Sequence, residues 1–294
     1  MMKKIGFTKM HGAGNDFMII NEWEGEAVPE AEKPAMIAKA CDRHFGVGGD
    51  GVIFIRRSDS VDARFHFFNP DGSIAEMCGN GIRCFAKYLY ENDIVRKETI
   101  LAETLAGVLE LKLTITDGNV SSVRVLMGAP QIARGKAQVA TGELTQPMIS
   151  EEVTIEGNTY ELTVVGMGNP HAIMFVKDVD KSDVTGDGHL IRNERQVFPN
   201  GTNVHFVEEA GYNKFRIRTY ERGVEDETLA CGTGICASAV AAVLTGRAEK
   251  DKQITFEARG GTITIDLEST GQDITGVYMT GPAETVFTGT ILID

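Results

Sequence analysis

The strongest constraint on the fold of this 294-residue chain is an internal repeat, because three short motifs occur twice in the same order. The second copy follows the first by about 153 residues: Gly12-Ala13-Gly14-Asn15 returns as Gly166-Met167-Gly168-Asn169, Phe45-x-x-Gly48-x-Asp50 as Phe198-x-x-Gly201-x-Asn203, and Cys78-Gly79-Asn80-Gly81 as Cys231-Gly232-Thr233-Gly234. Three matches at nearly one offset are hard to attribute to chance. We therefore predict two homologous domains, residues 1–132 and 150–283, connected through the polar stretch 131–152.

The predicted secondary structure gives each half an α+β fold. β-Branched or aromatic runs bounded by Gly, Asn or Asp predict strands at residues 17–20, 52–55, 64–68, 109–116, 120–126, 172–176, 204–207, 214–219 and 262–267. Apolar spacing and composition predict helices over 34–43, after the first Cys-Gly-x-Gly motif, and over 235–244. Each Cys-Gly-x-Gly motif therefore occupies a turn that opens a helix.

Charge and cysteine content narrow the classes of partner. The chain has 29 Lys and Arg against 42 Asp and Glu, a formal net charge of −13. This balance repels phosphate backbones and anionic lipid, so we expect neither a nucleic-acid nor a membrane partner. The N-terminus has no signal-peptide pattern, and the uncharged stretch between Glu227 and Arg247 is interrupted by glycines, which favours a buried helix. Five cysteines without such a signal predict reduced thiols and a cytoplasmic protein.

The paired cysteine turns indicate acid–base chemistry on a small anion. A helix N-terminus offers unpaired N–H groups and a partial positive charge, and glycines let that backbone approach a carboxylate. A cysteine there is expected to have a lowered pKa. Cys78 and Cys231, in repeated halves, predict two thiols that share one bound anion across a cleft. Such a pair could remove a proton from one face of a carbon and deliver one to the other.

Other interpretations of the cysteines and glycines are weaker. Cys41, Cys84 and Cys236 are read as small buried hydrophobes. Cys231-x4-Cys236 has a tolerated zinc-ligand spacing, but no matching Cys/His pair accompanies it, so we expect no metal. A Gly-x-Gly-x-x-Gly pattern over 46–51 follows a helix and precedes a strand, the reverse of a dinucleotide-binding turn.

Several polar residues in turns are further candidates for ligand binding. The side chain of an asparagine in a turn ordinarily forms hydrogen bonds with the nearby main chain. A lone histidine or an exposed Glu-Arg pair is ordinarily structural. The repeat relation of Asn15 and Asn169 favours a shared ligand, and Arg222 could bind a carboxylate through its planar guanidinium. The candidates are Asn15, Asn69, Asn80, Asn169, His171, Asn203, Glu221 and Arg222.

These motifs resemble one enzyme family. The residues that carry the resemblance are Phe7-Thr8-Lys9-Met10-His11-Gly12-Ala13-Gly14-Asn15-Asp16-Phe17, Asn69-Pro70-Asp71-Gly72, Glu76-Met77-Cys78-Gly79-Asn80-Gly81, Gly168-Asn169-Pro170-His171, Glu221-Arg222-Gly223 and Ala230-Cys231-Gly232-Thr233-Gly234. They are similar to the motifs of the diaminopimelate epimerases, from about residue 5 to the C-terminus. Proline racemases share the architecture but typically have His where this chain has Asn80, and phenazine-type isomerases lack the paired cysteines.

The resemblance implies a fold and an activity. Each domain would be a curved mixed sheet around a central helix, with the active site in the cleft between the domains and the last strand, 284–294, returning to the first domain. The reaction would convert L,L-diaminopimelate to the meso form, a step toward lysine and cell-wall precursors, without a cofactor such as pyridoxal phosphate. The enzyme would act on this small amino acid as a homodimer.

The resemblance also implies roles for individual residues. Cys78 and Cys231 would be the acid–base pair, and His171 and Glu221 would tune their pKa values. The α-carboxylate would bind at Gly79, Asn80, Gly232 and Thr233. The other polar groups of the substrate would bind at Asn15, Asn69, Asn169, Asn203, Glu221 and Arg222. Some members have a glutamine where this chain has Gly51, so any contact from that position would come from backbone.

Two other functions remain open on the sequence. One is a racemase of another amino acid, such as histidine, on the same scaffold, because distal side chains decide which substrate length fits. The other is a catalytically silent amino-acid-binding module, which loss of either cysteine would have favoured; both cysteines are present.

Overall fold

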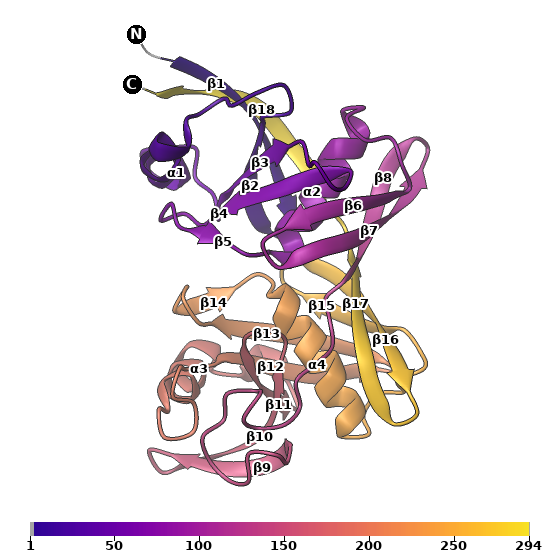
Figure 1. Ribbon diagram of the computed structural model, residues 1–294. Coiled ribbons are helices and arrows are strands. Elements are labelled where there is room, and N and C mark those ends of the chain that lie inside the picture. The colour runs from indigo at the N-terminus through magenta and orange to yellow at the C-terminus, as the bar shows by residue number, and fades with distance from the viewer. Residues whose placement is uncertain (1–2, 294) are drawn as a thin grey trace. The chain divides into compact units, whose positions relative to one another are not determined.

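The computed structural model describes residues 3–293, which divide into two compact units (Figure 1). Unit 1 takes in Met1–Val125 and Gly281–Asp294, and unit 2 takes in Leu126–Thr280. The segment 131–152, expected to be a connection, instead belongs to unit 2. Gln131 pairs with Gly166 there, and Ala137 and Val139 are buried in its core.

Unit 1 is built on one mixed sheet in the order β18–β1–β2–β3–β4–β6–β7–β8. Only the pairs β2–β3 and β4–β6 in this order are parallel. The short β5 (Ile74–Ala75) also pairs with β4. The other strands are β1 (Lys3–Gly12), β2 (Asn15–Asn21), β3 (Val52–Arg56), β4 (Ala63–Phe68), β6 (Thr99–Thr104), β7 (Gly107–Thr116), β8 (Asn119–Leu126) and β18 (Glu284–Ile293).

A buried helix, α2 (Gly79–Glu91), forms the centre of unit 1. Every residue from Gly79 to Tyr90 is buried, and the helix packs against β1, β2, β3 and β7. Because these strands are spread across one sheet, the sheet must curve around the helix. The shorter α1 (Lys33–Cys41) follows the single turn η1 (Glu30–Glu32).

Unit 2 repeats this plan. Its strand order is β9–β10–β11–β12–β13–β15–β16–β17, with β11–β12 and β13–β15 parallel. Helix α4 (Gly232–Leu244) packs against β10, β11, β12 and β16, and α3 (Val184–Asn193) packs against β12 and β13. The strands are β9 (Met148–Ile155), β10 (Asn158–Gly166), β11 (Pro170–Val176), β12 (Asn203–Gly211), β13 (Lys214–Glu221), β14 (Asp226–Thr228), β15 (Ile254–Ala258), β16 (Gly261–Thr270) and β17 (Asp273–Gly281); a single turn, η2 (Val179–Lys181), precedes α3.

The two sheets confirm the internal repeat and the predicted α+β class. Strands β10 to β17 correspond to β1 to β8, and the parallel and antiparallel pairs follow in the same succession. In unit 2 the place next to β10 is taken by β9, whereas in unit 1 the place next to β1 is taken by β18 from the far end of the chain. Each predicted strand and helix falls within, or within two residues of, an observed one.

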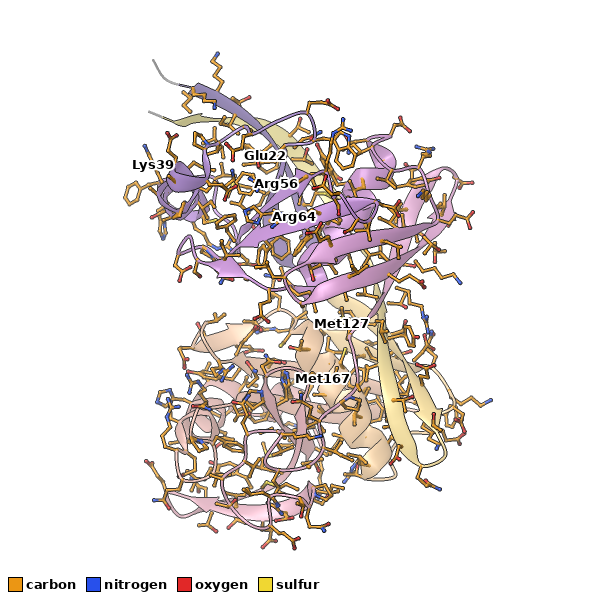
Figure 2. All side chains as sticks on the ribbon, in the orientation of Figure 1. Glu22, Lys39, Arg56, Arg64, Met127 and Met167 are labelled. Atoms are coloured by element: carbon orange, nitrogen blue, oxygen red, sulfur yellow. The ribbon has the colours of Figure 1, made fainter. Side chains whose placement is uncertain are left out.

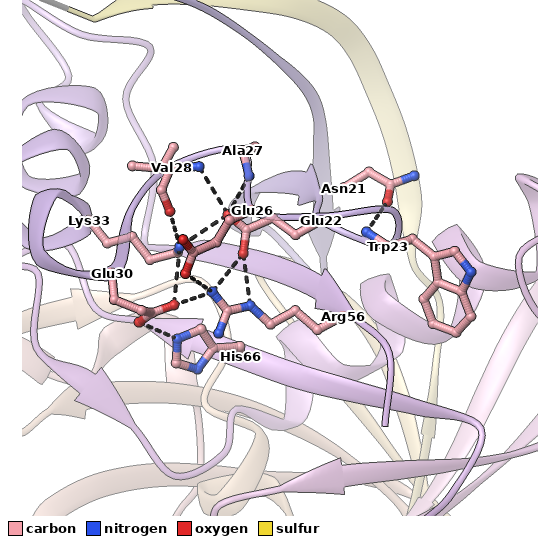
Figure 3. A network of polar contacts seen from close by, with 10 residues as sticks. All are labelled: Asn21, Glu22, Trp23, Glu26, Ala27, Val28, Glu30, Lys33, Arg56 and His66. Carbon is pink, nitrogen blue, oxygen red and sulfur yellow. Dashed lines mark hydrogen bonds and ion pairs between the residues drawn. The ribbon is translucent and has the colours of Figure 1, made fainter. Parts of the chain in front are cut away.

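A cluster of ion pairs joins the ends of β2 and β3 to the start of α1. Glu22 follows the last residue of β2, Arg56 is the last residue of β3, and the two strand ends are neighbours (Figure 2). Arg56 Nη2 lies 2.7 Å from Glu22 Oε2, and the fully buried Lys33 Nζ lies 3.0 Å from Glu22 Oε1 (Figure 3). Glu30 contacts both cations and His66. Partial burial raises the pKa of Glu30, but hydrogen bonds from Arg56 and Lys33 outweigh it and lower this pKa to about 2.

This shift predicts acid sensitivity in unit 1. The folded pKa of Glu30 is lower than its ordinary 4.5, so its ionised form stabilises the fold above pH 4.5, and this contribution is lost as the pH falls toward 2. In Glu30→Gln the free energy of unfolding should therefore fall less steeply between pH 4.5 and about 2 than it does in the wild type. The single tryptophan, Trp23, lies in unit 1, and its fluorescence can follow unfolding. The matched control is Glu32→Gln, two residues away and exposed. If Glu30→Gln and wild type lose stability in parallel, the ion pairs of Glu30 do not carry the effect.

Candidate active site

The first cysteine turn places a thiol at the N-terminus of α2. Cys78 is the N-cap residue in an extended conformation, and the Gly81 N–H donates to its Sγ at 3.4 Å. The thiol lies 3.6 Å from Asn15 Oδ1, to which it can donate. Asn80 Nδ2 also donates to this oxygen, at 3.4 Å. The structure thus brings together three of the predicted site residues of unit 1.

Asp50 fixes the orientation of Asn15. Asn15 Nδ2 donates to Asp50 Oδ2 at 2.5 Å, and Asp50 is paired with Arg43 at 2.7 Å. Because the amide nitrogen is held by this carboxylate, the carbonyl oxygen of Asn15 is the end that meets Cys78. Asp50 belongs to the repeated Phe-x-x-Gly-x-Asp motif, but its role as a partner of Asn15 was not predicted.

Arg83 is a second residue that sequence reasoning missed. It is fully buried in α2, where its guanidinium donates to Asn80 Oδ1 at 2.9 Å and to the carbonyls of Gly79 and Pro282. The available signal was a charged residue between Ile82 and Phe85, which mark the buried side of the helix. Its hydrogen bonds hold Asn80 and the first turn of α2 in place.

Asn69 forms hydrogen bonds within its own turn. Its Nδ2 donates to Ser73 Oγ at 3.0 Å, and its backbone N–H donates to the carbonyl of Ser73. These are the contacts of a turn between β4 and β5.

Position 51, where some members of the resembling family have a glutamine, is held in a backbone conformation that favours glycine. Gly51 has φ +155°, and an added Cβ would lie 2.4 Å from the carbonyl oxygen of Phe68. A glutamine does not fit this backbone, so position 51 can offer a ligand only its main chain.

The second cysteine turn places Cys231 at the N-cap of α4. Its Sγ lies 3.6 Å from Thr233 Oγ1. Burial, followed by the charge of Glu221, raises the pKa of the Cys231 thiol well above its ordinary value. This result opposes the lowering expected from the helix N-terminus, because a desolvated thiolate is costlier than the helix dipole can offset. Cys231 is therefore a thiol at neutral pH.

The start of β11 brings two further predicted residues together, Asn169 in the turn before the strand and His171 within it. His171 Nε2 lies 2.7 Å from Asn169 Oδ1, and the histidine is fully buried. Burial, with the charges of His205 and Arg222, lowers the pKa of His171 well below its ordinary value. His171 is therefore neutral at pH 7 and holds the amide of Asn169.

Asn203 joins two strand ends. Its Nδ2 donates to the carbonyl of Pro170 at 3.0 Å, and its Oδ1 accepts from the backbone N–H of Arg222 at 2.9 Å. The guanidinium of Arg222 donates to the carbonyl of Asn200. The neighbouring Glu221 accepts a hydrogen bond from Thr228 Oγ1 at 2.8 Å. These residues form a connected group at the end of β13.

The last glycine of each cysteine turn lets its helix approach the sheet. An added Cβ at Gly234 would lie 2.1 Å from the ring of His205, whereas at Gly81 it would lie 3.2 Å from the flexible Cδ1 of Ile53. Gly234→Ala should therefore lower the free energy of unfolding of unit 2 by about 1–3 kcal/mol. Gly81→Ala is the matched control with a smaller loss. Urea unfolding followed by circular dichroism compares them, and equal losses would contradict the packing argument.

The described residues 3–293 contain no group of three or more His, Cys, Asp or Glu side chains placed to hold a metal ion. All five cysteines are free thiols. Within the same residues, no helix is both long and apolar enough to cross a membrane.

The fold defines the class of protein. A phenazine biosynthesis protein from Bacillus anthracis matches with a TM-score of 0.73 at 17% identity, over 99% of this chain and 100% of that one. A hydroxyproline epimerase from Agrobacterium vitis matches with a TM-score of 0.72, also at 17% identity, over 99% of this chain and 92% of that one. The chain therefore has the two-domain fold that these proteins share.

Sequence comparison then gives the family. The profile of the diaminopimelate epimerase family matches residues 7–133 and 163–286. The diaminopimelate epimerase of Moorella thermoacetica is 43% identical over 98% of this chain and 99% of its own length, and that of Methanothermobacter thermautotrophicus is 43% identical with the same coverage. The chain belongs to the diaminopimelate epimerase family and is an enzyme of the isomerase class.

Proposed function

We propose that the chain interconverts L,L-diaminopimelate and meso-diaminopimelate, with Cys78 and Cys231 as acid and base. One observation carries the proposal: the two thiols occupy the same N-cap position of corresponding helices in two repeated units. Equivalent positions suit a reaction in which one group removes a proton and its counterpart returns one. The names of the relatives supply the substrate.

In the proposed mechanism one cysteine is a thiolate and removes the α-proton, and the other is a thiol that protonates the opposite face of the same carbon. The first becomes a thiol and the second a thiolate, so their roles reverse with the configuration of the substrate. The raised pKa of Cys231 favours it as the thiol of the resting pair. The N–H groups at both helix N-termini would stabilise charge that develops next to the carboxylate, so the protein itself replaces a pyridoxal cofactor.

The proposed binding groups fall into two sets, one around each cysteine turn, and we call each set a half-site. The backbone of Gly79 with Asn80, and of Gly232 with Thr233, would hold the α-carboxylate at the helix ends. The remaining polar groups of the substrate would meet Asn15, Asn69, Asn169, Asn203, Glu221 and Arg222. Glu221 would tune Cys231 by its charge, which already raises the thiol pKa. His171 would act in the same half-site through Asn169.

We also propose a homodimer formed through unit 1. Among the described residues, β18 pairs with β1 and lies at one edge of the sheet of unit 1, and it exposes 56% of Val286, 46% of Phe287 and 51% of Leu292. An apolar edge of this kind favours a second copy of the chain as its cover. Light scattering on the purified protein tests this. We place the enzyme in the cytoplasm, in line with its free thiols.

A chiral assay of the products from several free amino acids tests the function. Purified protein without added cofactor should convert L,L-diaminopimelate to the meso form. Lysine lacks the distal carboxylate, so it would leave polar groups of the site unpaired and should be a very poor substrate. Comparable kcat/KM for histidine would indicate a racemase of another amino acid. Binding without any turnover would indicate a silent binding module.

A further inference from the structure

A chain of buried hydrogen bonds leads from the sheet of unit 2 to Asn169. Thr219 Oγ1 lies 2.9 Å from His205 Nδ1, His205 Nε2 lies 2.9 Å from His171 Nδ1, and His171 Nε2 lies 2.7 Å from Asn169 Oδ1. Both histidines are fully buried and Thr219 is 3% exposed. The three residues come from the neighbouring strands β11, β12 and β13, directly beneath the first turn of α4.

The fold does not require this polar chain. The repeat places Phe17, Ile53 and Phe67 at the corresponding positions of unit 1, as the strand registers show. There Phe17 and Phe67 pack edge to face at 5.8 Å, and Gly81 of the cysteine turn rests on Ile53. An apolar cluster thus lies beneath the first helix at the place where the polar chain lies beneath the second. The polar chain therefore calls for a different explanation.

The partners of the chain determine its direction. Asn169 Oδ1 can only accept, so His171 must carry its proton on Nε2 and accept at Nδ1. His205 then donates from Nε2 and accepts at Nδ1 from the hydroxyl of Thr219. If the chain ran the other way, His205 would carry its proton on Nδ1 and donate to Thr219. The buried hydroxyl proton of Thr219 would then lose His205 Nδ1 as its acceptor, a costly loss in the protein interior. Burial lowers the pKa of His205 to about 3, so its ring is neutral as this arrangement requires.

The consequence is an opposite orientation of the two repeated asparagines. Asn15 has its amide nitrogen held by Asp50 and turns its carbonyl oxygen to Cys78, whereas Asn169 has its carbonyl oxygen held by His171. The amide nitrogen of the half-buried Asn169 is thus the end left for a ligand. One half-site offers an acceptor and the other a donor at matching places.

We propose that His205 and Thr219 are positioning residues: they fix His171 as the Nε2–H tautomer, which holds Asn169 so that its Nδ2 donates to a carboxylate of the substrate. The carboxylate part of this proposal rests on the proposed function, but the tautomers do not. Thr219 sets the direction and the two histidines transmit it. None of the three residues needs to touch the substrate or the reacting carbon.

Long-range proton–nitrogen NMR of the imidazole rings tests the chain directly, with signals assigned from single His→Gln variants. Wild type and Thr219→Ser should show both His171 and His205 in the Nε2–H form. Thr219→Val has nearly the same shape but no hydroxyl, so neither direction is favoured and Nδ1–H forms should appear. An Nδ1–H or protonated ring in wild type, or unchanged tautomers in Thr219→Val, would overturn the proposal.

Kinetics provide the second readout. Thr219→Val should raise KM for L,L-diaminopimelate by about 3- to 10-fold, the effect of one weakened hydrogen bond, with kcat nearly unchanged. Thr219→Ser should restore the wild-type KM. A lower kcat at constant KM, or a Ser variant as impaired as the Val variant, contradicts the positioning role. A wild type with the expected tautomers but no turnover would reject the proposed function and leave the hydrogen-bond chain intact.

Discussion

Replacing either Cys78 or Cys231 by alanine is expected to lower the rate of epimerisation by at least about 100-fold, because acid–base groups contribute about 10²- to 10⁴-fold to enzymatic rates. Both losses should be similar in size, since each direction of the reaction needs one proton acceptor and one proton donor. The measurement is the initial rate of meso-diaminopimelate formation from the L,L isomer, with circular dichroism to show that each variant is folded.

The matched controls remove a thiol from the interior of the same two helices. Cys84 in α2 and Cys236 in α4 are fully buried. Because neither thiol is exposed at all and neither stands at a helix N-terminus, neither can reach a bound substrate. Cys84→Ala and Cys236→Ala should retain most of the activity. Near wild-type activity in Cys78→Ala or Cys231→Ala would reject the two-base mechanism.

Replacing Lys33 by methionine is expected to lower the free energy of unfolding of unit 1 by about 3–5 kcal/mol. The side chains of Lys33 and Glu22 are 0% and 1% exposed, so removal of the ammonium leaves a buried carboxylate with fewer partners (Figure 3). The backbone N–H groups of Ala27 and Val28 also donate to this carboxylate, so the loss should loosen the segment before α1.

Urea unfolding followed by Trp23 fluorescence measures the loss in unit 1. Lys112→Met is the matched control, because Lys112 is exposed on β7 of the same unit, and such surface changes usually stay within about 0.5 kcal/mol. The double variant Lys33→Met with Glu22→Gln should recover part of the stability, since it removes the buried charge. A loss no larger than that of Lys112→Met would contradict the role of this ion pair.

The fold was predictable where sequence and tertiary structure agree. The repeated motifs predicted two similar units, and the strongly apolar strands were found at their predicted places. Helix α3 escaped prediction because Gly186 and Gly188 weaken its intrinsic helix propensity, and Asp183 stabilises it by capping the Gly186 N–H. Such a cap compensates for a weak pattern only once the chain is folded.

The candidate site was predictable only in part. The N-cap positions of Cys78 and Cys231 followed from the repeat, but the polar residues behind them did not. His205 and Thr219 lie on strands β12 and β13 among buried apolar residues. The sequence around them therefore has the pattern of strands in the core of a sheet. Their function depends on contacts between three strands, and strand neighbours distant in sequence cannot be read from local spacing.

Repeat motifs also overstated the likeness of the halves. Phe45 and Phe198 occupy the same motif position, yet Phe45 is 89% exposed and Phe198 is fully buried. The pKa of Cys231 likewise departs from the value that its helix position suggested, because burial and Glu221 dominate. Local position predicted the two cysteines as candidate acid–base groups, whereas the tertiary surroundings determine the pKa of Cys231.

Deuterium incorporation in heavy water tests the two-base account most directly. The thiol that donates its proton exchanges with solvent, whereas the thiolate removes hydrogen from the opposite face of the carbon. During initial turnover of L,L-diaminopimelate, wild-type enzyme should therefore place deuterium in the newly formed meso isomer, and the recovered L,L isomer should remain almost free of it. Equal early deuteration of the recovered substrate and the product would indicate a single base and contradict the account.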